Sequence, residues 1–272
     1  PGFGEVVVVM GLGLIGQVSI QLLAASSCRV IGFDLDKQKV ELARAMGIES
    51  YEVNDVDPVD KIMELTGQTG SDAVIITASS ESDEIISQSA RMSRKRGKIV
   101  LVGVVGLKLS RHDFYEKELS FQVSCSYGPG RYDPEYEAKG HDYPIGYVRW
   151  TEQRNFLAVL SALERGQLVV DELIASSFEL SDFKEVYGNL SDNSQIAVLF
   201  DYQHQKAPND TIVFSNNPNL DSEQVKVGII GAGNFCKNIV APLLKSLDYQ
   251  VNSVVSRSGI SAIEVAKKLN AN

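Results

Sequence analysis

Three glycines near the N-terminus have the spacing of a phosphate-binding turn. Gly11, Gly13 and Gly16 directly follow a β-branched run and stand at the start of a helical pattern. In such a turn the first glycine permits a tight bend, the second lets the backbone approach a pyrophosphate, and the third lets helix and strand pack closely. Because phosphates bind at a helix N-terminus, the motif predicts a dinucleotide site.

An acidic residue supports this interpretation. Asp34 ends the next predicted strand, where its carboxylate can accept hydrogen bonds from both hydroxyls of an adenosine ribose. The same charge repels a 2′-phosphate, so this first site is expected to prefer NAD to NADP. Leu35 supplies no compensating cation. Lys39 either reaches the adenosine ribose or is a solvated helix lysine.

A second turn of the same kind lies near the C-terminus. Gly231 and Gly233 again follow an apolar run and precede Asn234 and Phe235, but Cys236 replaces the third glycine. After the next predicted strand, Ser256 and Arg257 stand in place of an acidic residue. A hydroxyl and a guanidinium suit a 2′-phosphate, which favours NADP at this second site. The alternative is that an incomplete unit binds nothing.

No other residues form a recognisable catalytic or metal-binding pattern. The histidines have no ligand-like spacing, and the cysteines lie far apart without a Cys-x-x-Cys pair: His112, His141, His204, Cys28, Cys125 and Cys236. This spacing argues against a disulfide scaffold and a Cys-rich zinc site. The sequence therefore predicts a cofactor site with no catalytic residues of its own, and no bound zinc.

The composition limits the partners. The chain has 272 residues, 44% of them hydrophobic, and a formal net charge of −9. It contains no extended basic stripe and no apolar run of the roughly 20 residues that a membrane-spanning helix needs. We therefore expect neither nucleic acid nor membrane as a partner, and a cytoplasmic location.

The first hundred residues alternate short β-branched runs with helical patterns. Strands are predicted at 5–10, 28–33, 50–52, 73–76 and 98–102, and helices at 14–26, 36–46, 57–66 and 83–92. Strict alternation is typical of an α/β fold with a doubly wound parallel sheet, the Rossmann type. Residues 1–148 are interpreted as this domain, with 121–125 as a possible sixth strand.

The rest of the chain has three parts. Residues 107–147 read mainly as loop, and the five tyrosines at 127, 132, 136, 143 and 147 either pack on one another or contact a substrate. Residues 149–202 follow, with helices at 152–165 and 181–189 and strands at 173–178 and 196–202. Residues 203–224 read as a linker. Residues 225–272 begin a second Rossmann unit, with strands at 225–230 and 251–255 and helices at 235–247 and 260–269.

Residues 1–202 resemble the cofactor domain of the medium-chain dehydrogenase/reductase, or zinc-type alcohol dehydrogenase, family. The resemblance rests on Pro1-Gly2, the run from Val7 to Gly16, Asp34-Leu35-Asp36 with Lys39, Ala45-Met46-Gly47, and the run from Gly97 to Gly103. It implies that the cofactor contacts Gly11, Gly13, Leu14, Ile15, Gly16, Asp34, Leu35 and Lys39. The nicotinamide is expected near Thr77, Ala78, Val102 and Gly103.

The same resemblance implies what the segment 149–202 corresponds to. In that family the chain returns to a catalytic domain after the cofactor domain, as 149–202 would. The half that brings zinc ligands would precede Pro1. From Val225 onwards the chain resembles the start of the glucose–fructose oxidoreductase/inositol dehydrogenase (Gfo/Idh/MocA-like) family, whose catalytic lysine would lie beyond Asn272.

Together these features predict an NAD(H)-binding fragment of a two-module oxidoreductase that transfers hydride to or from an alcohol or sugar. The fragment itself is expected to be inactive. Two alternatives stay open: a regulatory domain that senses NAD, and a zinc-free quinone-type reductase. A homodimer is expected, because strand 121–125 would leave an apolar sheet edge for a second copy to pair with.

Overall fold

The computed structural model describes residues 1–189, 196–202, 225–247, 249–257 and 259–271. The chain divides into two compact units, Pro1–Asp201 and Tyr202–Asn272. The predicted linker, 203–224, lies outside the described residues. No helix in the described ranges is long and apolar enough to cross a membrane.

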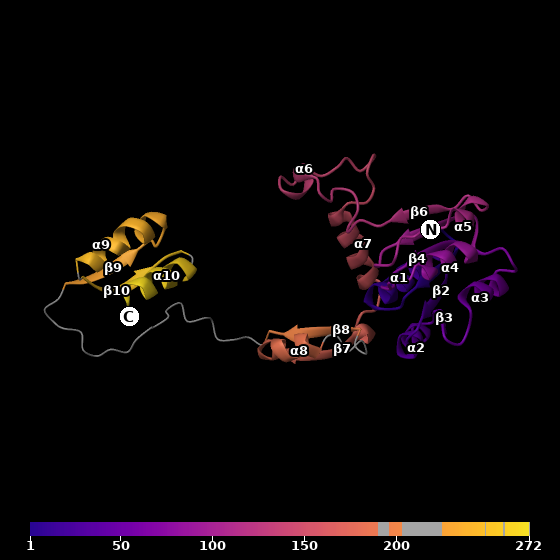
Figure 1. The fold of residues 1–272 in the computed structure, drawn as a ribbon, viewed down its shortest axis with the longest axis horizontal. Coiled ribbons are helices and arrows are strands. Elements are labelled where there is room, and N and C mark those ends of the chain that lie inside the picture. Colours follow the sequence, from indigo (N-terminus) through magenta and orange to yellow (C-terminus); the bar gives the residue numbers. More distant parts are fainter. Residues whose placement is uncertain (190–195, 203–224, 248, 258, 272) are drawn as a thin grey trace. The chain divides into compact units, whose positions relative to one another are not determined.

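The first unit is built on a six-stranded parallel sheet in the order β3-β2-β1-β4-β5-β6 (Figure 1). Its strands are β1 (Val6–Met10), β2 (Arg29–Asp34), β3 (Glu49–Glu52), β4 (Ser71–Ile76), β5 (Ser93–Leu101) and β6 (Ser120–Val123). The crossovers contain α1 (Leu14–Ala25), α2 (Lys37–Ala45), α3 (Pro58–Leu65), α4 (Glu84–Met92) and α5 (Arg111–Tyr115). The predicted α/β Rossmann fold is confirmed.

The period-two alternation of β1 creates the two faces of this sheet. Val7 and Val9 point into a core with side chains of α1 and α2. Val8 and Met10 point to the other face and pack with side chains of α3 and α4. All four are at most 3% exposed. A strand buried on both faces is what an unbroken apolar run predicts in a parallel sheet.

The basic run after α4 corrects the sequence interpretation. The helix predicted at 83–92 ends at Met92 as expected, but the strand predicted from 98 already starts at Ser93. The register with β4 shifts here, since Ser93 pairs with Ser71 and Lys98 with Ala73. The charged residues therefore occupy a bulge, where their side chains stay in solvent while the strand continues.

The region expected as loop contains two short helices. They are α5 and α6 (Pro134–Glu137), and Asp133 caps the latter by accepting the Glu135 N–H at 2.9 Å. Proline at the first helical position and an acidic N-cap explain α6. The sequence reading missed it because one turn of helix has no hydrophobic periodicity.

The remainder of the first unit begins with α7 (Glu152–Glu164). A short 3₁₀ turn, η1 (Asp171–Leu173), leads into β7 (Ile174–Glu179), and a second, η2 (Leu180–Asp182), leads into α8 (Phe183–Asn189). β8 (Ala197–Asp201) pairs with β7 in a separate two-stranded parallel sheet. A buried amide connects this segment to α1. Gln21 donates to the Val169 carbonyl at 3.1 Å and accepts the Val169 N–H at 2.7 Å.

The described part of the second unit is one βαβ arrangement followed by a helix. β9 (Lys226–Ile230) and β10 (Gln250–Val255) form a two-stranded parallel sheet, and α10 (Gly259–Leu269) packs on it. The helix expected at 235–247 is present, but its first part, η3 (Cys236–Val240), is π-helical and continues directly into α9 (Ala241–Ser246).

Candidate functional site

The first glycine turn is fixed on two sides. Gly11 has φ +100° and donates its N–H to the Phe33 carbonyl of β2 at 2.8 Å. A Cβ on Gly11 would lie 2.6 Å from the Ala78 nitrogen and 2.8 Å from its Cα. Glycine is therefore required here both by the backbone conformation and by the close approach of the chain after β4.

The chain segments after β4 and β5 complete this edge of the sheet. Thr77 donates its hydroxyl to the Gly11 carbonyl at 2.6 Å, and its N–H reaches the Met10 carbonyl at 2.9 Å. The N–H groups of Val102 and Gly103 both reach the Ile76 carbonyl at 2.9 Å. A Cβ on Gly103 would lie 2.0 Å from the Ala78 carbonyl oxygen. Residues expected near a nicotinamide thus gather beside the glycine turn.

Helix α1 begins without a side-chain cap. Gly13 is its N-cap in extended conformation, no side chain caps it, and its first turn holds no acidic residue. Helix geometry leaves the first N–H groups, at Leu14 and Ile15, without intrahelical acceptors. The space beside Gly13 contains no heavy atom within 4 Å of a built Cβ, whereas a Cβ on Gly16 would lie 2.0 Å from the Gly11 carbonyl oxygen. Gly16 packs the helix tightly, and Gly13 leaves room for a ligand.

Asp34 lies at the end of β2 beside the turn. Its Oδ2 accepts the Leu12 N–H at 2.6 Å, and its Oδ1 accepts the Asp36 N–H at 2.8 Å. A carboxylate has about four acceptor positions, so two remain for a ribose. The adjacent Leu35 side chain is exposed.

Lys39 is neither free nor fully solvated. Its ammonium group lies 3.5 Å from Asp36 Oδ2, and its side chain is 20% exposed. Reaching a ribose would require Lys39 to share this partner. The structure places Lys39 next to the Asp34 loop but does not bring it onto the carboxylate itself.

The second glycine turn is far more open. Gly231 has φ +95° and donates its N–H to the Val255 carbonyl at 2.7 Å, as Gly11 does to Phe33. Cβ atoms built on Gly231 and Gly233 would meet nothing within 4 Å. Asn234, Phe235 and Arg257 are exposed, and Ser256 is half-buried. These residues gather near one edge of a two-stranded sheet, and no wall corresponding to Ala78 stands beside them in the described part of the unit.

Two buried glutamines of α1 were not recognised from the sequence. Gln17 is fully buried, and its Nε2 donates to the Leu12 carbonyl at 3.1 Å and the Lys39 carbonyl at 2.8 Å. Gln21, one turn later, bonds the Val169 backbone. The available signal was their position on the same helix face as Ile20, where an apolar residue is expected.

The tyrosine-rich segment packs on itself. Ring centroids of Tyr127 and Tyr136 lie 6.2 Å apart, and those of Tyr136 and Tyr143 lie 5.8 Å apart. The hydrogen bond that Tyr127 donates to Glu137 raises the pKa of Tyr127 to about 12. Arg154 of α7 holds the segment by donating to the Tyr143 carbonyl at 2.6 Å. The described residues contain no group of three or more His, Cys, Asp or Glu side chains that could hold a metal ion.

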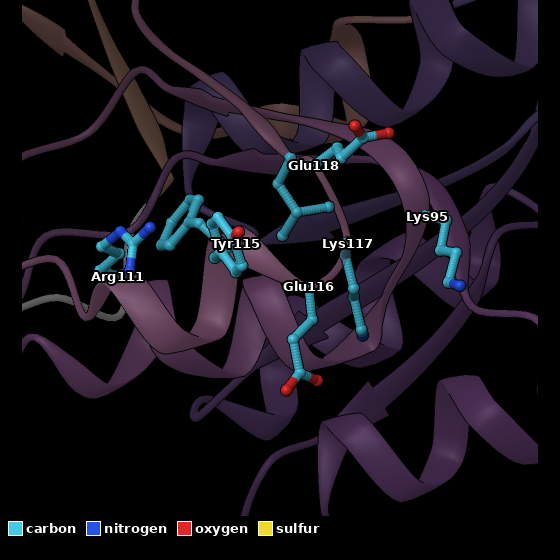
Figure 2. Close-up of a pocket in the computed structure, with 8 residues that line it drawn as sticks. Lys95, Arg111, Tyr115, Glu116, Lys117 and Glu118 are labelled. Atoms are coloured by element: carbon cyan, nitrogen blue, oxygen red, sulfur yellow. The ribbon is translucent and has the colours of Figure 1, made fainter.

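A hollow of about 690 Å³ is lined mainly by residues of and just after α5, several of which are drawn as sticks in Figure 2. Lys95 and Leu119 line it, which places it toward the amino ends of β5 and β6, opposite the edge that carries Gly11. Arg111 lies over the Tyr115 ring at 4.2 Å, and Lys117 donates to the carbonyls at the end of α4. Burial lowers the pKa of Lys117. Two of the cations that line the hollow, Arg111 and Lys117, are thus already engaged within the protein.

The comparisons with known proteins agree with this geometry. Residues 15–138 match the family model for zinc-binding dehydrogenases. The chain is 34% identical over 192 residues to an NAD-dependent alcohol dehydrogenase of Sulfurisphaera tokodaii, an alignment covering 68% of this chain and 47% of that protein.

Two solved structures have the same fold. The 2R,3R-butanediol dehydrogenase of Bacillus subtilis superposes with a TM-score of 0.60 at 22% identity, covering 75% of this chain and 52% of that one. Alcohol dehydrogenase TADH of Thermus sp. ATN1 gives 0.58 at 18% identity, with 74% and 52% covered. The chain spans about half the length of these relatives. Residues 15–138 are therefore similar in sequence to zinc-binding dehydrogenases, and the first unit shares the fold of these two dehydrogenase structures.

Proposed function

We propose that the first unit is the NAD(H)-binding part of an oxidoreductase that acts on an alcohol or sugar. The single observation that carries the proposal is the open space at Gly13, bounded by the uncapped start of α1 and by the carboxylate of Asp34. A pyrophosphate fits this position, since helix N-termini attract anions and no acidic side chain in the first turn opposes it.

Each residue then has a defined task. The N–H groups of Leu14 and Ile15 hold phosphate oxygens, and Gly11 and Gly16 keep the turn close to the sheet. Asp34 accepts hydrogen bonds from the adenosine ribose through its remaining lone pairs. Thr77, Ala78, Val102 and Gly103 form the surface against which the nicotinamide lies. When bound, NAD accepts or donates a hydride; the protein residues bind and orient it.

Filling the space at Gly13 tests the phosphate position. Gly13 has φ −66°, so Gly13→Val introduces no left-handed strain, and its side chain meets no protein atom. We expect NAD affinity, measured by calorimetry, to fall at least about 10-fold. The free energy of unfolding should fall by no more than about 1 kcal/mol, the cost of replacing glycine by valine at the N-cap. The matched control is Gly233→Val in the second turn, which should leave NAD binding at the first site intact. Unchanged NAD affinity in Gly13→Val would refute the assignment.

Cofactor choice at this site is assigned to Asp34. The carboxylate repels a 2′-phosphate, and solvent screening reduces that repulsion to a preference for NAD of roughly 10- to 100-fold. Asp34→Ser is expected to narrow the gap mainly by improving NADP binding. Titration of both dinucleotides into the wild-type chain is the test, and tighter binding of NADP than NAD would contradict the role of Asp34.

Two further assignments are proposed on weaker support. The second unit is proposed to be the start of a glucose–fructose oxidoreductase-like module, with NADP at Gly231 and Gly233, on the basis of its sequence motif alone. The chain is proposed to form a homodimer through β6, which stands at one end of the sheet order and leaves its outer edge unpaired within it. A monomer by sedimentation at micromolar concentration would contradict the dimer.

A further inference from the structure

One fully buried polar side chain touches both halves of the proposed dinucleotide site. Gln17 is 0% exposed in the first turns of α1. Its amide nitrogen donates to the Leu12 carbonyl in the glycine turn and to the Lys39 carbonyl in α2, at 3.1 and 2.8 Å. Its Oε1 is buried without a hydrogen-bond partner in the described structure. Burying a polar atom without a hydrogen-bond partner lowers the stability of the fold. A glutamine at this position is therefore expected to contribute something that an apolar residue would not.

These two hydrogen bonds complete a closed ring of interactions of which the Asp34 carboxylate is a member. The Leu12 N–H donates to Asp34 Oδ2 at 2.6 Å, while the Leu12 carbonyl accepts from Gln17. On the other side, the Asp36 N–H donates to Asp34 Oδ1 at 2.8 Å. Asp36 Oδ2 in turn lies 3.5 Å from the Lys39 ammonium, and the Lys39 carbonyl accepts from Gln17. Gln17 is the member of this ring that spans from the turn to α2.

The neighbouring glutamine shows what a purely structural role looks like. Gln21 lies one turn further along α1, is also buried, and also pairs its amide with backbone groups. Its partners are the Gln17 carbonyl of the same helix, at 3.4 Å, and the backbone of Val169, which is far from Asp34 in the sequence and outside the ring. Two buried amides on one helix face therefore hold different elements, and only Gln17 bonds to groups that position the ribose-binding carboxylate.

We propose that Gln17 is a positioning residue that sets the distance between the glycine turn and Asp34, and thereby selectivity for a dinucleotide with a free 2′-hydroxyl. This inference rests on the proposed function. It goes beyond it by assigning cofactor selectivity to a residue that does not touch the cofactor. Without Gln17, α2 loses its side-chain bond to the turn, so the Asp34 carboxylate, which keeps its bond to the Leu12 N–H, is held less accurately beside the ribose.

The test compares Gln17→Met with Gln21→Met. Methionine keeps the chain length of glutamine but removes the amide donors and the acceptor. Affinities for NAD and NADP are measured by calorimetry well below the unfolding temperature of each variant. We expect Gln17→Met to lower the NAD/NADP affinity ratio about 10-fold, mainly by strengthening NADP binding as in Asp34→Ser, because a displaced carboxylate repels the 2′-phosphate less. Gln21→Met should lower the unfolding temperature and leave that ratio unchanged.

A double-mutant cycle with Asp34→Ser decides whether Gln17 acts through the carboxylate. If it does, Gln17→Met in the Asp34→Ser background should change the NAD/NADP affinity ratio by less than about 3-fold. Equal weakening of NAD and NADP, or full additivity in the cycle, would overturn the proposal. Failure of the wild-type chain to bind either dinucleotide would instead overturn the proposed function.

A measurement on the wild-type chain covers the case in which Gln17→Met does not fold. The side-chain amide resonances of Gln17 should shift in NMR spectra when NAD is added, because ribose binding at Asp34 is transmitted around the ring. The amide resonances of Gln21 should stay in place. Saturation with NAD that leaves the Gln17 amide unmoved would contradict the inference.

Discussion

The two glycine turns of this chain share a motif but differ in what surrounds them. Both begin with a left-handed glycine whose N–H bonds the carbonyl at the end of the neighbouring strand. Around Gly11 the chain after β4 approaches so closely that a Cβ has no room, while around Gly231 a Cβ would meet nothing. The glycine motif thus specifies a local bend, and a wall beside it comes from a third strand that the motif does not encode.

The third position of the motif makes the difference sharper. Gly16 leaves no space for a side chain, whereas its counterpart Cys236 is accommodated and buried at 6% exposure. Cys236 also opens the π-helical segment η3. A π-helix has a wider turn than an α-helix, which gives the second unit a physical means of accepting a side chain where the first unit cannot.

The largest expected effect is therefore at Gly16. In Gly16→Ala the added carbon lies 2.0 Å from a backbone oxygen, so the helix or the turn must move. We expect a loss of about 3 kcal/mol in unfolding free energy, the upper part of the range for overpacking. The single tryptophan, Trp150, lies in the first unit, so denaturant unfolding followed by its fluorescence reports that unit.

The reciprocal variant is Cys236→Gly. It should destabilise the second unit by only about 1 kcal/mol, through the flexibility of glycine in a helix. Equal losses of unfolding free energy in Gly16→Ala and Cys236→Gly would show that the two turns are packed alike.

A matched pair at the first glycine gives the next largest effect. Gly11→Ala and Gly231→Ala both place alanine at a positive φ, with a similar backbone strain of about 1 kcal/mol. Only Gly11→Ala also drives a carbon into the Ala78 backbone, for a further loss of about 1 kcal/mol. Hydrogen exchange of peptides from each unit measures the two losses separately. A larger loss of unfolding free energy in Gly231→Ala than in Gly11→Ala would contradict the conclusion that the second turn is open.

The sequence predicted the parts that depend on local patterns. The alternation of β-branched runs and helical periods identified the Rossmann sheet, and the glycine spacing with Asp34 identified the candidate site. It could not reveal that Ala78 stands against Gly11, because this contact joins positions remote in the chain. Gln17 stands on the apolar face of a predicted helix, but that position does not reveal its partners, and only the structure shows that its amide donates to the Leu12 and Lys39 carbonyls.

The two units also differ in how strongly their ion pairs hold them. In the first unit, Asp72 accepts the Val6 N–H at 2.7 Å and the Arg94 Nε–H at 2.5 Å, which ties together the start of β1, β4 and the bulge of β5. Burial acts to raise the pKa of Asp72, but these donors outweigh it and the pKa lies below its usual 3.8. Asp72→Asn should destabilise the first unit by about 1–2 kcal/mol at pH 7.

The pH dependence of that difference has a definite sign. A carboxylate with a depressed pKa in the folded state contributes stability above its unfolded value and loses it as the pH falls through the folded value. The gap between wild type and Asp72→Asn should therefore stay constant from neutral pH down to about 5 and close below 3.8. A gap that persists at lower pH would mean that packing, and not charge, holds this junction.

The smallest effect is expected at the corresponding ion pair of the second unit. Lys237 of η3 donates to Glu264 of α10, and the hydrogen bond from Lys237 lowers the pKa of Glu264. The Glu264 side chain is 62% exposed, against 22% for Asp72, so water screens the pair and competes for both groups. Glu264→Gln should leave hydrogen exchange in β9 and β10 unchanged within error at neutral pH. A loss of protection as large as that of the first unit in Asp72→Asn would show that the second unit depends on its surface charges. The difference between the two units would then lie in this ion pair as well as in the packing of their glycine turns.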